Sequence, residues 1–271
     1  MNECCKDIIC ENCLALLYID ERRRFVFKVR RGDRQGSDKG VLDHDSIIGL
    51  PYGSKVRLNT GVEAYVLRPT LRDLMERYFE RRSQVIYPKD HGMILFLSGI
   101  GPGSRVIEVG VGSGFTTAML AWFVGESGKV YAYEIRTDML EVAKRNLERI
   151  GLLDRVELKL RDARVGFDEK NVDAVIVDMP DPWNILDVAY KALRPSGSFV
   201  AFMPSINQVQ RLLLALQEHH GFEDIAIVEV LSREYQPRPD ALRPKTTMIA
   251  HTGYILAARK VYSQTNSKHV T

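Results

Sequence analysis

No apolar run in the 271-residue sequence reaches the roughly 18 to 20 residues that a membrane-spanning helix needs, so we do not expect a transmembrane protein. The first residues lack the basic segment and following apolar stretch of a secretory signal, which makes the cytoplasm the expected location. A long disordered chain is also excluded, because 45% of the residues are hydrophobic and 27% are charged. The length favours one large domain with an appendage, or two domains.

Cysteine does not occur after residue 13, and all four cysteines (Cys4, Cys5, Cys10 and Cys13) precede that point. Cys10-x-x-Cys13 has the spacing of half a zinc site, but the other pair lies much closer than the dozen or so residues usual in zinc ribbons. A tail with reduced thiols is the alternative. His44 and His251 have no ligand partner at usable spacing and are expected to be hydrogen-bonded structural residues, so no metal site is predicted.

The net charge of +3 is low but unevenly distributed. Residues 1–83 hold 16 Lys and Arg against 13 Asp and Glu, whereas the remainder balances at 22 against 22. Seven basic residues and one acidic residue fall between Arg22 and Arg34, a segment that we call the basic stripe. Such a stripe suggests a polyanionic partner, and a solvated strand face is the alternative.

Hydrophobic patterning divides the chain into four parts: a cysteine-containing tail (1–13), an N-terminal β domain (14–68), a helical connector (69–83) and a catalytic domain (84–271). Short strands with period-two alternation are predicted at 14–19, 24–30, 55–58 and 64–67, which is typical of a small β-barrel or sandwich. Pro69 then opens a predicted helix over 70–82.

Strands and helices alternate from about residue 90, which predicts a doubly wound α/β domain. The expected strands are 105–109, 129–133, 156–160, 172–177, 198–202, 225–231 and 254–258, and the expected helices are 116–124, 138–150, 186–193 and 209–219. A Pro-rich loop too short for a helical crossover separates the last two strands, so we expect them to form an antiparallel hairpin.

A glycine-rich loop, Gly-Val-Gly-Ser-Gly at 110–114, lies between a predicted strand and a predicted helix. Glycines allow a tight turn and close approach to a ligand, and the helix N-terminus adds N–H donors. The G-x-G-x-G spacing differs from the nicotinamide pattern G-x-G-x-x-G, and no Walker lysine follows. Alone the loop is weak evidence, because any tight turn could use these glycines.

Acidic residues at strand ends strengthen the prediction of a ligand site. Glu108 precedes the loop, Glu134 and Asp178 follow the second and fourth strands, and Asp162 follows the third in Arg161-Asp162-Ala163. Glu134 is placed to accept hydrogen bonds from ribose hydroxyls, and Asp162 from an adenine amino group. A single acid there could be a helix cap, but four in register with a glycine loop are harder to explain by capping.

This arrangement resembles the class I S-adenosylmethionine-dependent methyltransferases, and further motifs resemble the tRNA (adenine-58, N1)-methyltransferase family of the TrmI type. The matching stretches are Gly-Leu-Pro-Tyr-Gly at 49–53, Leu-Arg-Pro-Thr-Leu at 67–71, Gln-Val-Ile-Tyr-Pro-Lys-Asp at 84–90, Asp-Met-Pro-Asp-Pro-Trp at 178–183, Arg-Pro-Lys-Thr at 243–246 and His-Thr-Gly-Tyr at 251–254. The resemblance implies a β-rich N-terminal domain, a Rossmann-like catalytic domain and a homotetramer.

The resemblance also implies roles for individual residues. The cofactor-binding set would be Glu108, Gly110, Gly112, Ser113, Gly114, Phe115, Glu134, Met139, Asp162, Ala163 and Asp178. Asp178 would be the active-site acid, and Tyr87 would lie over the methyl-transfer site. The sequence departs from the family pattern at three points. His91-Gly92 replaces the usual small residues, Met139 replaces an expected polar residue, and the cysteine tail has no counterpart in the family pattern.

Adenine N1 carries a free lone pair once its base pair is broken, so methylation needs no strong base, and a fixed carboxylate such as Asp178 can stabilise the cationic product. Tyr87 and Trp183 are candidates to receive the unstacked base, although Trp183 could instead be a core anchor. The basic stripe and a loop with Arg233, Arg238, Arg243 and Lys245 would bind tRNA.

We therefore expect a tRNA N1-adenine methyltransferase that modifies position 58, with position 57 as a second candidate position. A methyltransferase for a protein or small molecule and a non-catalytic RNA-binding subunit are the alternatives. A nicotinamide-dependent dehydrogenase fails on the glycine spacing.

Overall fold

The computed structural model describes residues 7–262, and its chain separates into two compact units. One unit extends to Glu80 and includes Arg149–Gly151; the other comprises Arg81–Glu148 and continues from Leu152. The sequence prediction places the start of the catalytic domain at residue 84. Within the described residues, no helix is long and apolar enough to span a membrane.

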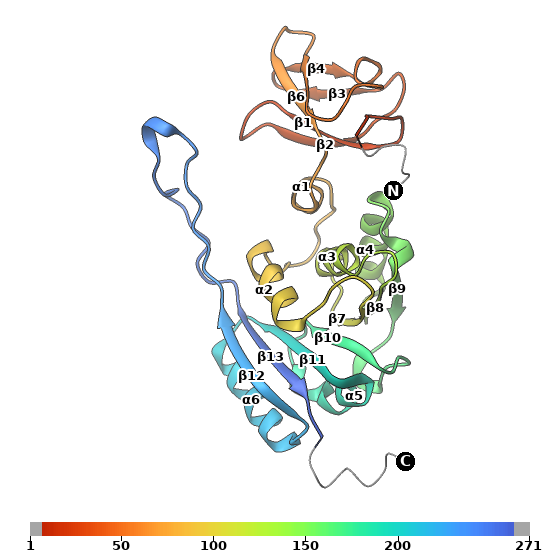
Figure 1. Cartoon of the computed structure of the whole chain (residues 1–271), viewed down its shortest axis with the longest axis vertical. Coiled ribbons are helices and arrows are strands. Elements are labelled where there is room, and N and C mark those ends of the chain that lie inside the picture. The colour runs from red at the N-terminus through yellow and green to blue at the C-terminus, as the bar shows by residue number, and fades with distance from the viewer. Residues whose placement is uncertain (1–6, 263–271) are drawn as a thin grey trace. The chain divides into compact units, whose positions relative to one another are not determined.

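The N-terminal unit is built from antiparallel strands (Figure 1). Its four-stranded sheet has the order β2 (Arg24–Lys28), β1 (Leu14–Tyr18), β6 (Glu63–Leu67) and β5 (Ser54–Arg57), and a second sheet pairs β3 (Arg34–Ser37) with β4 (Gly40–Asp43). Alternating side chains such as Ala64 and Val66 point into a core that also contains Leu17 and Phe27. The β-rich prediction is confirmed, but the sequence patterning did not indicate β3 or β4.

The connector helix α1 (Leu71–Arg77) is shorter than the predicted helix over 70–82. Thr70 and Asp73 form a capping box, in which the Asp73 amide donates to the Thr70 hydroxyl at 3.2 Å and the Thr70 amide to the Asp73 carboxylate at 3.0 Å. The helix therefore begins where Pro69 and Thr70 dictate, and it ends well before the basic residues Arg81 and Arg82.

The second unit contains a seven-stranded mixed sheet (Figure 1). Its order is β12 (Phe222–Glu229), β13 (Tyr254–Lys260), β11 (Leu193–Met203), β10 (Val172–Val177), β7 (Arg105–Val109), β8 (Lys129–Glu134) and β9 (Val156–Leu160). β13 is antiparallel to both of its neighbours, whereas β7 to β11 pair in parallel. The predicted Rossmann-like fold and terminal hairpin are confirmed, and β13 inserts between β11 and β12.

Helices cover both faces of this sheet (Figure 1). α2 (Pro88–Ser98), α3 (Phe115–Val124) and α4 (Thr137–Arg149) lie on one side, and α5 (Leu186–Ala192) and α6 (Ile206–His219) lie on the other. The central strand β10 is almost entirely apolar because both of its faces are buried, and its side chains join a core with Phe199 and Leu212. The chain reverses its winding between β7 and β10, which is where such sheets bind ligands.

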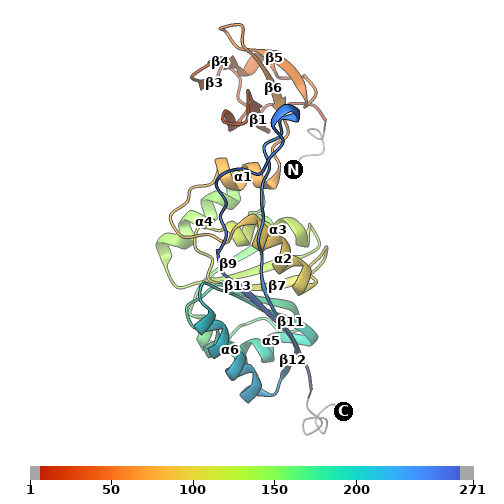
Figure 2. The same cartoon turned by 90° about the vertical axis from the view of Figure 1, so that its left-hand side faces the viewer.

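A long arm, residues 230–253, joins β12 to β13 (Figures 1 and 2). Its two strands are linked by an isolated bridge between Tyr235 and Pro244 and by the Lys245 amide, which donates to the Glu234 carbonyl at 2.8 Å. Both views show the arm extending away from the sheet. Because β12 ends and β13 begins at the carboxyl edge of the sheet, the arm leaves from the same edge as the glycine loop.

Candidate active site

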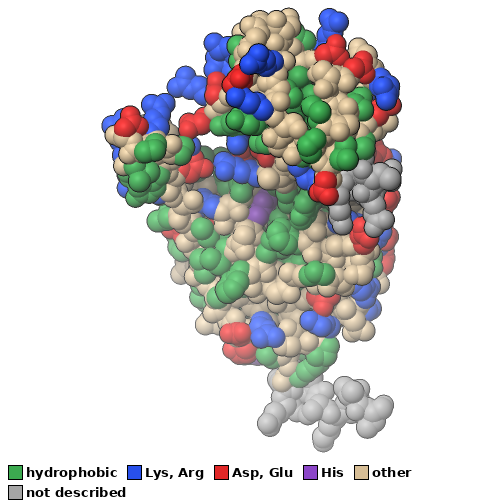
Figure 3. All heavy atoms as spheres, turned by 45° about the horizontal axis from the view of Figure 1, so that its top comes forward, with side chains coloured by type: hydrophobic (Ala, Val, Ile, Leu, Met, Phe, Trp, Pro, Cys, Tyr) green, Lys and Arg blue, Asp and Glu red, His purple; other side chains and the backbone are tan. Residues whose placement is uncertain are grey.

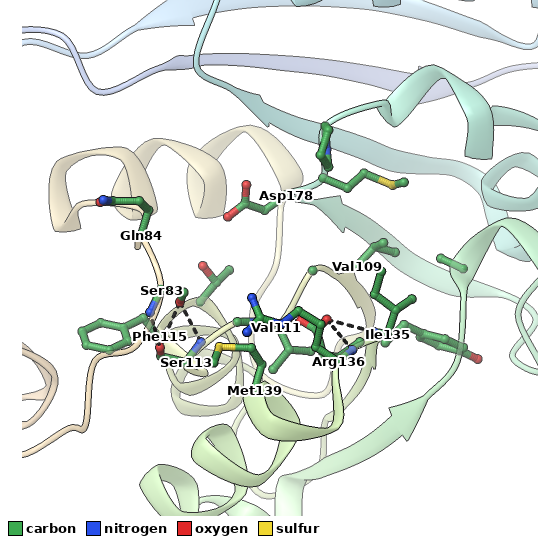
Figure 4. Close-up of a pocket in the computed structure, with 18 of the residues that line it drawn as sticks. Ser83, Gln84, Val109, Val111, Ser113, Phe115, Ile135, Arg136, Met139 and Asp178 are labelled. Carbon is green, nitrogen blue, oxygen red and sulfur yellow. Dashed lines mark hydrogen bonds between the residues drawn. The ribbon is translucent and has the colours of Figure 1, made fainter.

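A cavity of about 270 Å³ lies at the carboxyl ends of the parallel strands, over the crossover point between β7 and β10 (Figure 4). Its walls come from the glycine loop, the ends of β8, β9 and β10, the start of α4 and the segment before α2. Predicted site residues that line it are Gly110, Gly112, Ser113, Phe115, Glu134, Met139, Asp162, Ala163 and Asp178. The fold thus brings together side chains that are distant in the sequence.

Two glycines of the loop have positions that no other residue fits. Gly110 has φ 88°, and a Cβ added there would lie 1.9 Å from the carbonyl oxygen of Asp178. Gly114 has φ 81° and caps α3, where a Cβ would lie 2.9 Å from the Ala143 Cβ of α4. The loop therefore packs closely against the end of β10 and against α4, which only glycine allows at these two positions.

Glu134, at the end of β8, holds the middle of the glycine loop. One carboxylate oxygen accepts from the Gly112 amide at 2.9 Å, and the other accepts from the amides of Ile135 at 2.8 Å and Arg136 at 3.0 Å. The side chain is 8% exposed and lines the cavity. These bonds fix the carboxylate where a ligand's hydroxyl groups could reach it, which fits the predicted ribose-binding role.

A strap, residues 81–86, closes one side of the cavity, and the sequence prediction did not include it among the cofactor contacts. Ser83, Gln84, Val85 and Ile86 line the cavity. The Ser113 hydroxyl accepts from the amides of Arg82 at 2.9 Å and Ser83 at 3.1 Å, and the Ser113 amide donates to the Ser83 hydroxyl at 3.0 Å (Figure 4). The loop therefore holds the strap in place. The only signal in the sequence was that 84–90 belongs to a family motif.

The adenine side of the predicted site is lined by Asp162, Ala163 and Met139. Asp162 caps a short 3-10 helix, because its carboxylate accepts from the Arg164 amide at 2.9 Å, so the capping alternative raised from the sequence also holds here. Ala163 and Met139 are buried, at 3% and 4% exposed. The apolar Met139 side chain extends one wall of the cavity from the first turn of α4 (Figure 4).

Asp178 follows β10 directly, and its amide donates to the Val109 carbonyl at 2.8 Å. Figure 4 shows its carboxylate on the opposite side of the cavity from Met139 and Ser113. Among the residues that the structure describes, no side chain or amide donates a hydrogen bond to this carboxylate. Burial raises the pKa of Asp178 to about 6, and the nearby charge of Glu134 adds to the rise. A carboxylate that receives no hydrogen bond from the protein, has a raised pKa and faces a ligand cavity is typical of a catalytic group.

Glu108 lies beneath the glycine loop rather than on the cavity wall. It is 1% exposed, and neither carboxyl oxygen has a hydrogen-bond partner in the described structure. Burial raises the pKa of Glu108 to about 8; the neighbouring Thr117 hydroxyl lowers it, and the charges of Asp178 and Glu134 raise it further. The group is therefore protonated at neutral pH. Its predicted role as a direct cofactor contact stays a prediction.

The two predicted base-binding aromatics lie outside the cavity lining. Tyr87 caps α2, and its carbonyl accepts from the Asp90 amide at 2.9 Å. Trp183 packs against the core, its Nε1 is buried without a partner, and the Arg211 guanidinium stacks 4.1 Å from the ring centroid. For Trp183 these contacts favour the core-anchor interpretation.

Basic residues are unequally available for a polyanion. In the basic stripe, Arg23 pairs with Asp20 and Asp38, and Arg24, Arg31 and Arg34 also have acidic partners. In the described chain, no acidic side chain pairs with Arg22, Lys28 or Arg30. On the arm, Lys245 pairs with Glu234 at 2.5 Å, while Arg233, Arg238 and Arg243 are exposed. Figure 3 shows basic and hydrophobic side chains sharing the arm surface.

The candidate zinc ligands fall partly outside the described residues, because Cys4 and Cys5 precede residue 7. From residue 7 to 262, no group of three or more His, Cys, Asp or Glu side chains could hold a metal ion. His44 is buried and accepts from the Arg30 amide at 3.1 Å, and His251 bonds Glu229 and the Pro204 carbonyl. Both are hydrogen-bonded structural histidines, as predicted.

Comparisons with known proteins agree with the motifs. Residues 63–252 match the family described as tRNA methyltransferase complex GCD14 subunit. The tRNA (adenine(57)-N(1)/adenine(58)-N(1))-methyltransferase TrmI of Methanocaldococcus jannaschii is 36% identical over 270 residues, covering 90% of this chain and 94% of the relative.

Two solved structures share the whole fold. The tRNA (m1A58) methyltransferase TrmI of Aquifex aeolicus has a TM-score of 0.81 at 30% identity and covers 94% of this chain and 100% of its own. A protein of Thermotoga maritima described as a SAM-dependent O-methyltransferase has a TM-score of 0.86 at 38% identity, covering 95% and 96%. The family match and the relative's identity over most of both chains confirm the resemblance inferred from the motifs: the chain belongs to the TrmI family of tRNA methyltransferases.

Proposed function

We propose that the protein transfers a methyl group from S-adenosylmethionine to N1 of adenine 58 in tRNA. The observation that carries this proposal is Asp178: a carboxylate without hydrogen-bond donors, facing a cavity lined by the glycine loop, in a chain of the TrmI family. Position 57 is a second candidate target, because the Methanocaldococcus relative is named for both positions.

The residues present fit S-adenosylmethionine. Glycine at 110 lets the loop pack against the Asp178 backbone at the edge of the cavity, where a Cβ would collide with the Asp178 carbonyl oxygen. Gly110 to Phe115 and the strap would hold the methionine end, Glu134 the ribose, and Asp162 and Ala163 the adenine. Met139 adds apolar contact. When bound, this cofactor supplies a methyl group on a positively charged sulfur, and carboxylates around the cavity suit a cation.

Asp178 performs the electrostatic part of the reaction. Attack by the N1 lone pair would form the N–CH₃ bond while the sulfur–methyl bond breaks, leaving neutral S-adenosylhomocysteine and a positive charge on the adenine ring, so no proton must be removed first. A fixed carboxylate stabilises that charge and accepts from the exocyclic amine, and its effect is strong because the site is largely shielded from water. Alignment of the base with the cavity supplies much of the remaining rate enhancement.

The target base must leave its stack to reach the cavity, and Tyr87, at the start of α2, is the aromatic group proposed to receive it. The tRNA backbone would contact the basic stripe and the arm, including Arg243 and Lys245. We also propose a homotetramer, as the family resemblance implies, a cytoplasmic location with the tRNA pool, and a functional division into the N-terminal β domain and the catalytic domain.

The decisive experiment is methyl transfer to an unmodified tRNA transcript, with position mapping by nucleoside mass spectrometry. We expect 1-methyladenine at position 58 with the wild type. Asp178→Ala should lose at least about 100-fold in kcat, in line with the removal of one preorganised electrostatic group, while affinity for S-adenosylhomocysteine changes little. Asp187→Ala, which removes an exposed carboxylate on α5, is the matched control and should retain full activity. An equal loss of turnover and cofactor affinity in Asp178→Ala would make Asp178 only a binding residue.

A second candidate is methylation of a hydroxyl oxygen, which the printed description of the Thermotoga neighbour suggests. A hydroxyl must lose its proton on attack, and Asp178, whose pKa is raised to about 6, could accept it. Nucleoside mass spectrometry of the same tRNA distinguishes the two reactions. Detection of methylated ribose in place of 1-methyladenine would support methylation of oxygen and refute methylation of adenine N1.

A further inference from the structure

A buried charged cluster joins α2 to both strands of the arm where they leave the sheet. It consists of Lys89 and Asp90, in the first turn of α2, and Thr252, on the arm strand that returns to β13. The Asp90 side chain is 0% exposed and that of Lys89 is 11% exposed. Buried charges are costly unless they are paired and hydrogen-bonded, so their presence at this position calls for a reason.

Every donor in the cluster has a partner. The Lys89 ammonium donates to the Asp90 carboxylate at 2.9 Å, to the Val230 carbonyl at 2.6 Å and to the Thr252 hydroxyl at 2.5 Å. An ammonium has three protons, so Lys89 has none left for a tRNA phosphate. The Thr252 hydroxyl donates a hydrogen bond to the second Asp90 carboxylate oxygen at 2.7 Å. The cluster is therefore closed, and its contacts are with the arm rather than with a ligand.

The two arm contacts lie on opposite strands. Val230 directly follows β12, and Thr252 lies two residues before β13, so Lys89 ties the outgoing and returning strands together. α2 begins directly after Tyr87, whose carbonyl accepts the Asp90 amide. One cluster thus connects the base of the arm to the helix that carries the proposed base-receiving residue.

We propose that Lys89, Asp90 and Thr252 are positioning residues for tRNA, which fix the direction of the arm relative to the active site. This inference rests on the proposed function, because it requires the arm to contact the substrate. The arm leaves from the same edge of the sheet that carries Asp178, and only β11 separates β13 from β10, which Asp178 follows. Basic side chains on a fixed arm can hold the tRNA at a set distance from Asp178, whereas a loosely held arm loses binding free energy to its own ordering.

Thr252 offers the cleanest test, because breaking the buried Lys89–Asp90 pair could unfold the protein. Thr252→Val keeps the shape and removes the hydroxyl, whereas Thr252→Ser keeps the hydroxyl. Loss of the two hydroxyl bonds should raise the KM for tRNA about tenfold in the valine variant. Its kcat at saturating tRNA should stay within about threefold, and S-adenosylhomocysteine affinity should not change, because the strap, glycine loop and Asp178 are untouched. The serine variant should match the wild type in all three quantities.

Hydrogen exchange of the free protein provides the second readout. Amides at the arm base, around Val230 and Thr252, should exchange faster in Thr252→Val than in the wild type or in Thr252→Ser. An unchanged KM for tRNA in Thr252→Val would overturn the proposal, as would an equal rise in the serine variant or a parallel loss of cofactor affinity. If the wild type transfers no methyl group to tRNA, the proposed function fails, and exchange at the arm base alone then decides whether the cluster holds the arm.

Discussion

Replacing Glu108 with Gln should remove a large pH dependence from the stability of the catalytic unit. The native pKa of Glu108 is about 8 because of burial, whereas the ordinary value is 4.5. Between pH 4.5 and about 8 the folded state keeps a proton that the unfolded state releases. The contribution of Glu108 to the free energy of unfolding is therefore intact below the unfolded-state pKa and is lost as the pH rises through the folded-state pKa. Each pH unit in that interval costs about 1.4 kcal/mol, which gives roughly 4 to 5 kcal/mol as an upper bound.

Gln has nearly the same shape and is neutral at every pH, so it avoids this cost. At pH 5 the variant should be about as stable as the wild type, and by pH 8 it should be more stable by about 2 to 4 kcal/mol, allowing for local relaxation around the ionised group. Urea unfolding followed by tryptophan fluorescence is the suitable assay, because both tryptophans, Trp122 and Trp183, lie in the catalytic unit.

The matched control is Glu141→Gln, which changes an exposed carboxylate on α4 and should follow the wild-type curve. Parallel pH profiles for the wild type and Glu108→Gln would refute the reasoning, because they would mean that Glu108 is already ionised in the folded protein. The experiment uses the cofactor-free protein so that ligand binding does not add its own pH dependence.

Three further outcomes are expected. The kcat/KM of the wild type for S-adenosylmethionine, which reports groups of the free protein, should fall as the pH drops through about 6 and be roughly tenfold lower at pH 5, because protonation of Asp178 removes the stabilising charge; a flat profile over that range would contradict this role. Gly110→Ala should abolish S-adenosylhomocysteine binding in calorimetry, since its Cβ would lie 1.9 Å from a backbone oxygen, whereas Gly101→Ala, where nothing lies within 4 Å, should bind normally. Trp183→Phe should lower the free energy of unfolding by about 1 to 3 kcal/mol with kcat within about twofold, because the ring packs between the core and Arg211; a large loss of kcat at unchanged stability would instead make it the base receptor.

Much of the catalytic fold could be predicted from the sequence because its signals are local. β7 and β10 begin and end where the apolar runs predicted, since these central parallel strands are buried on both faces. β9, at the edge of the sheet, also has its predicted bounds. The glycine loop and the acids at strand ends were found for a similar reason. Parallel strands present their carboxyl ends at one edge, so spacing along the chain is enough to gather Glu134, Asp162 and Asp178 around one cavity.

Other features depend on contacts that no local pattern encodes. The sequence patterning did not indicate α2, because Gly92 lies inside it and its buried residues include Asp90 and His91 in place of an apolar stripe. The strap is held by side-chain and backbone bonds between Ser83 and Ser113, which lie 30 residues apart. The hairpin of β12 and β13 was predicted, but the length of chain between them did not reveal a projecting arm or its attachment at Lys89.

The three acidic residues nearest the glycine loop illustrate how environment, rather than residue type, sets function. Glu134 accepts three backbone N–H groups and therefore organises the loop. The Glu108 carboxyl oxygens make no hydrogen bond and are buried away from solvent, so burial keeps Glu108 a neutral acid under the loop. Asp178 also receives no hydrogen bond from the protein, but it faces the cavity, where a bound cation can interact with its carboxylate. If all three were ionised, their mutual repulsion would raise the energy of the empty site. Because Glu108 is neutral and the Glu134 carboxylate is already hydrogen-bonded to three amides, Asp178 is the carboxylate that can stabilise the positive charge developing in the reaction.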